Sequence, residues 1–221
     1  MIRLETGNLL DTQHTIASDI FEGKRYAFEV LPEIKEFIRQ LSMTLDSHKF
    51  DDLGNGVFVA KSAKVASSAS ITGPCIIDED AEIRHCAFIR GNTIVGKGAV
   101  VGNSTELKNV ILFDKVQVPH YNYVGDSVLG YKSHLGAGAI TSNVKSDKTN
   151  VSITLDTKKY NTNLRKFGAI LGDSVEVGCG TVLNPGTVVG KNTNIYPLSM
   201  VRGYVGENSI YKGRGDIVRK S

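Results

Sequence analysis

Aliphatic residues recur at every sixth position along two long stretches of this chain. A small residue follows most of them four positions later. The six-residue positions are Val59, Val65, Ile71, Ile77, Ile83, Ile89, Val95, Val101, Leu107 and Phe113, and then Leu171, Val177, Leu183, Val189, Ile195 and Val201. This period matches neither the 3.6-residue repeat of a helix nor the two-residue alternation of an ordinary strand.

The period predicts a β-solenoid, in which each six-residue unit forms a short strand and then a tight corner. Three units would close one triangular coil, so that residues 18 apart stack at the strand spacing of about 4.8 Å. Stacked coils bury a continuous aliphatic column and hydrogen-bond to one another through their backbones. A β-sandwich with chance periodicity is the alternative, and the number of positions in phase argues against it. We therefore expect an all-β, parallel β-helix.

The first 50 residues follow a different pattern. Apolar residues from Val30 to Leu45 have helical spacing, with Pro32 and Glu33 near the start, and a weaker helical pattern covers residues 16–26. We expect residues 1–50 to form a helical cap over the open end of the solenoid. Residues 51–221 would then form the solenoid domain.

The six-residue rhythm fails in two places, and function is expected there because regular units need only to pack. The first interruption, residues 119–143, contains His120, Tyr121, Tyr123 and His134 in a shortened coil. The second, residues 144–169, is rich in lysine. Its Val151–Ile153–Leu155 alternation predicts a protruding arm, which could be a hairpin.

The composition fits this picture and excludes several classes of protein. The chain has 23 glycines, no tryptophan and 7% aromatic residues, as a narrow aliphatic core requires. Its net charge of +3 is too small to indicate nucleic-acid binding. No apolar run is long enough to span a bilayer, and the first residues do not resemble a signal peptide. Three cysteines without CxxC spacing favour a cytoplasmic protein with no disulfide framework.

Arg90 and Lys108 are 18 residues apart, and each directly follows an inward aliphatic residue. They should therefore stack on one outer face of the solenoid. Stacked cations repel each other unless an anion or carboxylates neutralise them. A phosphate suits the planar guanidinium and the ammonium group. The alternative is a pair of solvated cations with Glu106 as a partner.

His120 lies in the first interruption, beside Tyr121 and Tyr123. A lone histidine is more often a structural or surface residue than a catalytic base. However, an imidazole titrates near pH 6.5, which suits it to accept a proton from an attacking amine.

Four ordered motifs carry a closer resemblance. Arg90 precedes GNSTELKN at 102–109, and HYNYVGDSVLG and GAGAITSN follow at 120–130 and 136–143. With Lys166–Phe167 and VGEN at 205–208, they resemble the hexapeptide-repeat, left-handed β-helix acyltransferases over roughly residues 57–205. The subfamily they resemble is the acetyltransferase half of the bifunctional glucosamine-1-phosphate N-acetyltransferase/N-acetylglucosamine-1-phosphate uridyltransferases.

The resemblance implies roles for individual residues and acetyl-CoA as cosubstrate. The catalytic residues would be His120, Ala137 and Asn143. His120 would be the general base, the backbone N–H of Ala137 would help to hold the developing oxyanion, and Asn143 would position the sugar amine or the acetyl group. The residues binding the sugar phosphate would be Arg90, Lys108, Tyr123, His134 and Lys166. The residues contacting coenzyme A would be Ala137, Cys179, Pro197 and Arg214. The resemblance also implies a left-handed coil and a homotrimer with sites between subunits.

Some features depart from the family pattern. His134 stands where asparagine is common, and Val144 where a tyrosine often follows the GAGAITSN motif. No nucleotide-binding half precedes the repeat, so uridyl transfer is not expected. Some hexapeptide-repeat proteins are carbonic anhydrases with three histidine ligands. His85, His120 and His134 lack that spacing, and no metal is expected.

The sequence therefore predicts an acetyl-CoA-dependent N-acetyltransferase acting on an amino-sugar phosphate, with glucosamine 1-phosphate as the leading acceptor. Two alternatives stay open. One is a non-catalytic solenoid that binds a sugar phosphate or nucleotide, or serves in assembly. The other is an acetyltransferase for a different amine.

Overall fold

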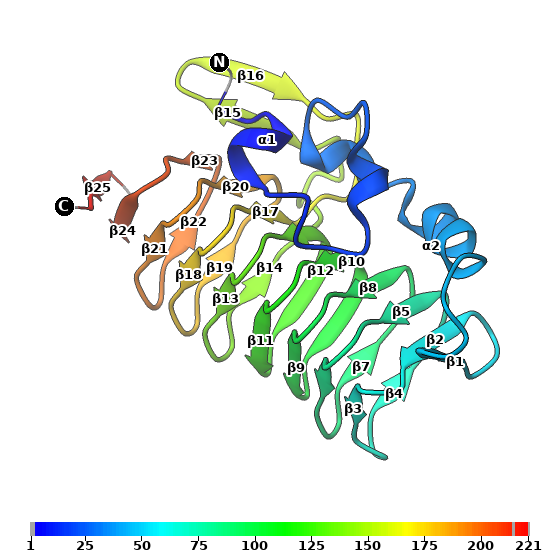
Figure 1. Ribbon diagram of the computed structural model, residues 1–221. Helices are drawn as coiled ribbons and strands as arrows, with labels where there is room; N and C mark the ends of the chain where they lie inside the picture. Colours follow the sequence, from blue (N-terminus) through cyan, green and yellow to red (C-terminus); the bar gives the residue numbers. More distant parts are fainter. Residues whose placement is uncertain (1–2, 214, 221) are drawn as a thin grey trace.

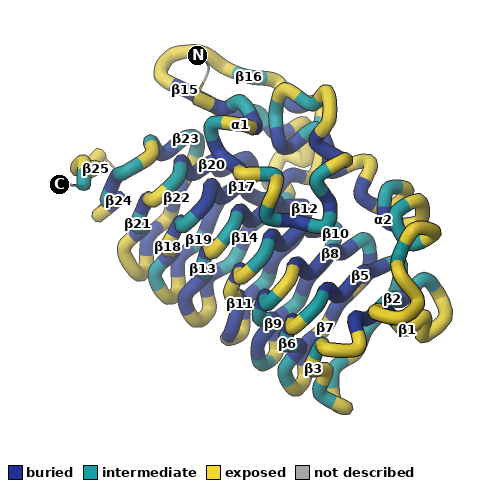
Figure 2. The backbone as a smooth tube through the Cα atoms, viewed as in Figure 1, coloured by how far each residue is buried: buried dark blue, intermediate teal, exposed yellow. Residues whose placement is uncertain are grey.

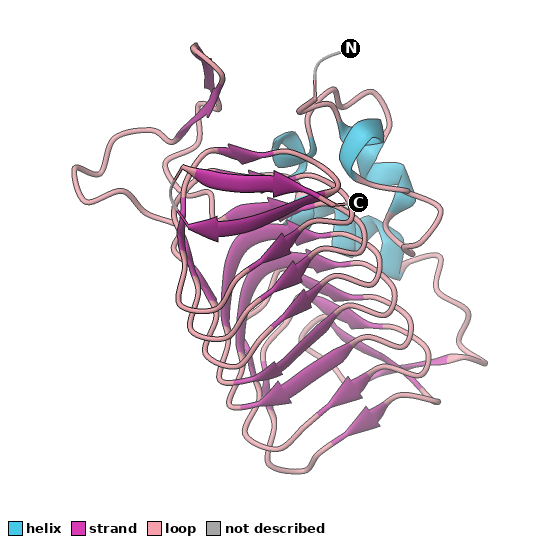
Figure 3. Ribbon diagram, turned by 90° about the vertical axis from the view of Figure 1, so that its left-hand side faces the viewer, coloured by secondary structure: helices cyan, strands magenta, loops and turns pink. Residues whose placement is uncertain are grey.

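A computed structural model describes residues 3–213 and 215–220. The chain winds into a parallel β-solenoid whose strands stack in three faces (Figure 1), as the six-residue period predicts. Seen along the coils, the strands enclose a narrow interior (Figure 3).

The first face is formed by strands paired in parallel from coil to coil, with β1 (Phe50–Asp52) antiparallel at its edge. Its strands are β2 (Val57–Ala60), β5 (Cys75–Ile77), β8 (Thr93–Val95), the ends of β10 (Glu106–Leu112) and β12 (Tyr123–Leu129), β17 (Ala169–Leu171), β20 (Thr187–Val189) and β23 (Tyr204–Val205).

The second and third faces repeat the same stacking. The second contains β3 (Lys64–Val65), β6 (Glu82–Ile83), β9 (Val100–Asn103), β11 (Gln117–His120), β13 (His134–Leu135), β18 (Glu176–Val177), β21 (Asn194–Ile195) and β24 (Ser209–Gly213), with β25 (Asp216–Arg219) antiparallel to β24. The third contains β4 (Ser70–Ile71), β7 (Phe88–Ile89), the starts of β10 and β12, β14 (Ile140–Thr141), β19 (Val182–Leu183) and β22 (Met200–Val201).

The aliphatic positions of the repeat form the core. From Ile77 to Leu107 and from Leu171 to Val201, every one of them is buried. The expectation for Phe113 is wrong by one residue, because Leu112 takes the register position opposite Val95 and Phe113 packs against Phe21 of the N-terminal segment. Figure 2 shows the strands of the middle coils largely buried and many corners exposed. Ile71 is half-buried on β4, and Val65 is 40% exposed. Val65 lies on β3, which ends the stack of the second face and has no strand beyond it to cover its side chain.

Two middle coils are one residue shorter than the regular coils. Thr93 pairs with Val110, and Val110 with Ser127, so each step advances 17 residues where the regular step is 18. The corner between the third and first faces is one residue shorter in these coils. There a single residue turns the chain, with left-handed backbone at Asn109 (φ 56°) and Asp126 (φ 47°). Asparagine and aspartate tolerate this conformation better than most side chains.

The N-terminal segment lies along the side of the solenoid, against the first face (Figure 1), and the expected position over the open end is wrong. Its elements are α1 (Thr6–Leu9), the 3-10 helices η1 (Ser18–Phe21) and η2 (Ala27–Val30), and α2 (Ile34–Ser42). Phe21 packs against Phe113 and Phe28 against Phe167. These rings and the apolar side of α2 cover the outer surface of the first face. The division of the chain at residue 50 stays a prediction.

The second interruption contains the expected hairpin. Strands β15 (Ser152–Leu155) and β16 (Lys158–Asn161) pair in antiparallel fashion. Val151 and Ile153 are fully buried, and the Val151 side chain lies against Gly186 of the solenoid. The hairpin therefore buries one side against the body of the protein.

Candidate functional site

A ladder of three polar side chains occupies the shortened corner. Asp126 stands between Asn109 and Asn143, 17 residues from each, and is only 5% exposed. The Asn109 side-chain amide donates to Asp126 Oδ1 at 3.0 Å, and Asn143 donates to Asp126 Oδ2. Asn109 also donates to the backbone oxygen of Leu31 at 3.1 Å. This bond ties the N-terminal segment to the ladder. Asp126 and Asn109 lie within the sequence motifs but were not among the predicted site residues.

Arg90 and Lys108 stack next to this ladder, as the 18-residue spacing predicts. The Arg90 backbone N–H donates to Leu107 O at 2.8 Å, which places Arg90 and Lys108 at adjacent register positions. Carboxylates accompany both cations. Arg90 Nη1 lies 2.6 Å from Glu106 Oε1, and Lys108 Nζ lies 3.7 Å from Asp126 Oδ2. The Glu106 contact raises the pKa of the Arg90 guanidinium. Glu106 is thus a carboxylate partner of Arg90, as expected if the two cations are solvated surface residues.

Tyr123 completes the group on the third face. Its hydroxyl accepts a hydrogen bond from Asn143 at 3.3 Å. Burial, and then the charges of Asp126 and Glu106, raise the pKa of the Tyr123 phenol. A Cβ at Gly125 would lie 2.5 Å from the Tyr123 hydroxyl. Glycine at position 125 therefore leaves room for the Tyr123 hydroxyl beside Asn143.

Lys166 lies at the end of the second interruption and is exposed. The next residue, Phe167, donates its backbone N–H to Asn143 O at 2.9 Å. Gly168 donates to Asp126 O at 2.8 Å. The interruption thus returns to the solenoid directly at the polar ladder, which brings the Lys166 backbone to the group of Arg90, Lys108, Tyr123 and Asn143.

A second column of residues follows the opposite edge of the third face, at its corner with the second. His120, Ala137, Cys179 and Pro197 occupy successive register positions there, and all four are exposed. Backbone bonds of 2.8–3.0 Å join the coils, from Gly138 N to His120 O, from Gly180 N to Ala137 O and from Leu198 N to Cys179 O.

The His120 corner is held from inside by Asn122, which is 2% exposed. Its side-chain oxygen accepts the His120 backbone N–H at 3.1 Å, and its amide donates to Gly136 O at 2.8 Å. A Cβ at Gly136 would lie 2.6 Å from the backbone nitrogen of Cys179. Only glycine therefore permits this coil spacing. Asn122 was not among the predicted site residues.

His134 is separate from the group around Lys108. It lies on the second face, between Gln117 and Glu176 in register. Its Nδ1 is 2.8 Å from Glu176 Oε2. Arg214, expected to contact coenzyme A, lies outside the described residues.

The described residues offer no group of three histidine, cysteine, aspartate or glutamate side chains suited to a metal ion. Among the same residues, no helix has the length and apolar character needed to cross a membrane.

Comparison with known proteins identifies the family to which this arrangement corresponds. A family model described as the GMPPB C-terminal domain matches residues 71–193. The bifunctional protein GlmU of Methanococcus vannielii is 36% identical over 257 residues, covering 95% of this chain and 62% of the relative. A bifunctional sugar-1-phosphate nucleotidylyltransferase/acetyltransferase of Sulfurisphaera tokodaii is 31% identical over 178 residues, covering 72% of this chain and 44% of the relative. The chain spans about half the length of these curated relatives.

Among solved structures, a hexapeptide transferase family protein from Anaplasma phagocytophilum matches with a TM-score of 0.42 and 16% identity. That match covers 75% of this chain and 81% of the other.

Proposed function

This chain belongs to the hexapeptide-repeat family that includes the GMPPB C-terminal domain, and on that premise we propose that it is an acetyl-CoA-dependent N-acetyltransferase for an amino-sugar phosphate. One observation carries the proposal. The exposed His120 and the stacked Arg90–Lys108 pair lie at opposite edges of the third face. The short strand between them, residues 123–125, advances roughly 10 Å. A hexosamine phosphate is of that size.

The proposed reaction is a direct transfer. The amine nitrogen of the sugar attacks the thioester carbon of acetyl-CoA, and His120 accepts a proton from that nitrogen. The backbone N–H of Ala137 stabilises the negative charge that develops on the carbonyl oxygen. The carbon–sulfur bond then breaks, and the thiolate takes the proton back from His120. The products are the N-acetyl sugar and coenzyme A.

The acceptor phosphate lies against Arg90, Lys108 and Lys166 in this proposal. The two carboxylates beside the first two cations hold their side chains in place before substrate binds. Tyr123, whose raised pKa keeps it protonated, donates a hydrogen bond to the substrate. Asn143 orients the reacting amine or acetyl group.

Acetyl-CoA lies along the exposed column that continues from His120 through Ala137, Cys179 and Pro197. Arg214 contacts a phosphate of the coenzyme. A homotrimer, in which a neighbouring subunit closes this column, is part of the proposal.

Thiol release from acetyl-CoA tests the proposed function. Glucosamine 1-phosphate should be acetylated faster than unphosphorylated glucosamine, because only the former has an anion for Arg90 and Lys108. Equal rates with the two sugars would contradict the phosphate site. Absence of transfer to any amino sugar, with retained sugar-phosphate binding, would favour the non-catalytic solenoid. Transfer only to an amine of another class would favour the second alternative.

We expect Lys108→Ala to raise the KM for glucosamine 1-phosphate roughly tenfold or more, since charge-assisted hydrogen bonds contribute about 1.5–3 kcal/mol. The KM for acetyl-CoA should stay within about twofold, because the coenzyme lies at the other edge of the face. Steady-state kinetics measure both constants.

Lys191→Ala is the matched control, because Lys191 forms a comparable ion pair with Asp173 at 2.9 Å, away from the site. A similar rise in KM for this control, or an unchanged acceptor KM for Lys108→Ala, would argue against the assignment.

Cysteine alkylation tests the proposed path of the coenzyme. Cys86 and Cys179 are exposed, whereas Cys75 is buried, and burial raises the pKa of its thiol to about 12. Native protein should therefore be alkylated at Cys86 and Cys179 and not at Cys75, as measured by mass spectrometry. Saturating coenzyme A should slow modification of Cys179 at least about fivefold and leave Cys86 unaffected. Equal rates at Cys179 with and without the coenzyme would place the path elsewhere.

A further inference from the structure

A groove of about 1140 Å³ separates the hairpin from the solenoid. The segment before the hairpin contributes Ser142 and Lys145, and strand β16 contributes Lys159. The opposite wall comes from the last coils, with Asn184, Arg202 and Tyr204. None of these residues belongs to the site described above. The groove nevertheless begins beside it, because Ser142 and Val144 flank Asn143 and both line the groove.

The solenoid register connects the groove to the proposed phosphate site. Parallel pairing places one residue from each successive coil in a single outward column of the third face. From one end to the other the column reads Arg90, Lys108, Gly125, Ser142, Asn184 and Arg202. Cations thus stand at both ends, and the middle positions are small or polar. Four coil steps separate Lys108 from Arg202, which corresponds to about 19 Å.

The charges in the groove favour an anion. Within residues 3–213 and 215–220, the Lys159 ammonium group forms no ion pair. The Arg202 guanidinium donates to the neutral Asn184 side chain at 3.4 Å and forms no ion pair with any described residue. Lys145 is paired with Asp147 at 3.2 Å, and the other acid in the groove, Asp156, is neutralised by Arg3. Two cations are therefore available for a ligand.

We propose that this groove binds a phosphate-bearing extension of the acceptor, so that the acceptor is an amino sugar linked to a nucleoside diphosphate. The inference rests on the proposed function, because the sugar and its first phosphate are placed at Tyr123, Arg90 and Lys108. The second phosphate meets the Lys159 ammonium group, which the hairpin contributes. The nucleoside lies along the column over Asn184 and Arg202, whose side chains offer hydrogen-bond donors.

The same chemistry could come from the phosphates of coenzyme A, and the position of the groove favours the acceptor. The coenzyme column of His120, Ala137, Cys179 and Pro197 follows the other edge of the third face. Ile140, Val182 and Met200 are the first residues of β14, β19 and β22, and they stack in register between the two columns. The groove is therefore separated from the coenzyme column by a row of apolar side chains and is continuous with the acceptor phosphate site.

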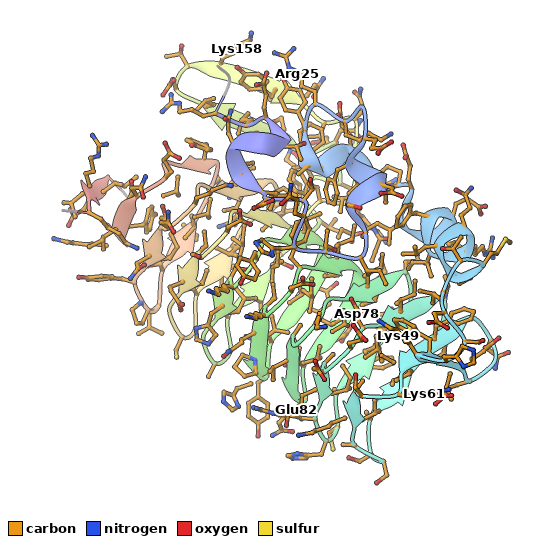
Figure 4. All side chains as sticks on the ribbon, viewed as in Figure 1. Arg25, Lys49, Lys61, Asp78, Glu82 and Lys158 are labelled. Atoms are coloured by element: carbon orange, nitrogen blue, oxygen red, sulfur yellow. The ribbon has the colours of Figure 1, made fainter. Side chains whose placement is uncertain are left out.

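The test compares UDP-glucosamine with glucosamine 1-phosphate, which share the sugar and its first phosphate. We expect a KM at least about tenfold lower for UDP-glucosamine in the wild-type enzyme. The double variant Lys159→Ala/Arg202→Ala should raise the KM for UDP-glucosamine about tenfold, and more than it raises the KM for glucosamine 1-phosphate. The matched control is Lys158→Ala on the same hairpin (Figure 4), whose ammonium lies over the Tyr160 ring at 5.2 Å. It should leave both constants unchanged.

Calorimetric binding of UDP separates this inference from the proposed function. UDP binding that is lost in the double variant supports the groove, even if no acetyl transfer is found. Acetylation of glucosamine 1-phosphate without any UDP binding supports the proposed function and overturns the groove. A rise in the KM for acetyl-CoA as large as that for UDP-glucosamine would assign the groove to the coenzyme and also overturn the inference.

Discussion

Replacing His120 with alanine is expected to lower kcat for acetyl transfer at least about a hundredfold, which is the usual contribution of a general base. The imidazole is exposed at a corner whose backbone is fixed by the buried Asn122, so the substitution should leave the coil intact. The KM values for both substrates should change little, because the proton transfer belongs to the chemical step. Thiol release under saturating conditions measures the effect.

His85→Ala provides the matched control. His85 is an exposed histidine at the same corner of the solenoid, on the far side of Asn103 from His120. It should retain wild-type kcat. Retention of wild-type turnover by His120→Ala would remove the proposed base, and a comparable loss in His85→Ala would point to a general effect on this corner.

Replacing Asp126 with alanine should lower kcat/KM about a hundredfold without a direct role for the carboxylate in the chemistry. Its loss removes one hydrogen-bond acceptor from each of the Asn109 and Asn143 amides and removes the partner of Lys108. A hydrogen bond to a charged group contributes about 1.5–3 kcal/mol. A displacement of about 1 Å in the groups that position a substrate is enough for a hundredfold loss. Asp126 is thus expected to act as a positioning residue.

The effect on activity must be separated from the effect on folding. Asp173→Ala removes a comparable buried carboxylate, which accepts backbone bonds from Asp11 and Tyr131 and pairs with Lys191. Both variants should lower the melting temperature by similar amounts, and only Asp126→Ala should raise the acceptor KM. Asp126→Asn, which keeps one acceptor oxygen, should recover part of the activity. Equal kinetics for Asp126→Ala and Asp173→Ala would reduce Asp126 to a structural residue.

The stacking of Arg90 on Lys108 shows how far the repeat carries sequence analysis. In a solenoid the neighbour of a residue in space is one coil away in sequence, so an 18-residue count identifies it. An 18-residue count does not predict that Asp126 lies beside Asn109 and Asn143, because these coils contain 17 residues. The shortening follows from a single-residue left-handed corner, and only the backbone conformation reveals it.

The N-terminal segment shows a different limit. Helical spacing correctly predicted a helix near residues 34–42. The place where this segment packs depends on contacts such as Phe28 with Phe167 and Asn109 with the Leu31 carbonyl, which join residues far apart in the chain. A helical pattern specifies an apolar side without specifying the surface that covers it.

By itself, the sequence determined the β-solenoid, its aliphatic core and the stacked pair of cations, because a six-residue hydrophobic period can be buried only when coils stack in register. The tertiary structure decided the rest. It placed Asp126 between two asparagines, laid the N-terminal segment along the first face, and opened a groove beneath the hairpin. These features depend on corner geometry and on contacts between distant segments, and a local pattern of residues does not specify either of them.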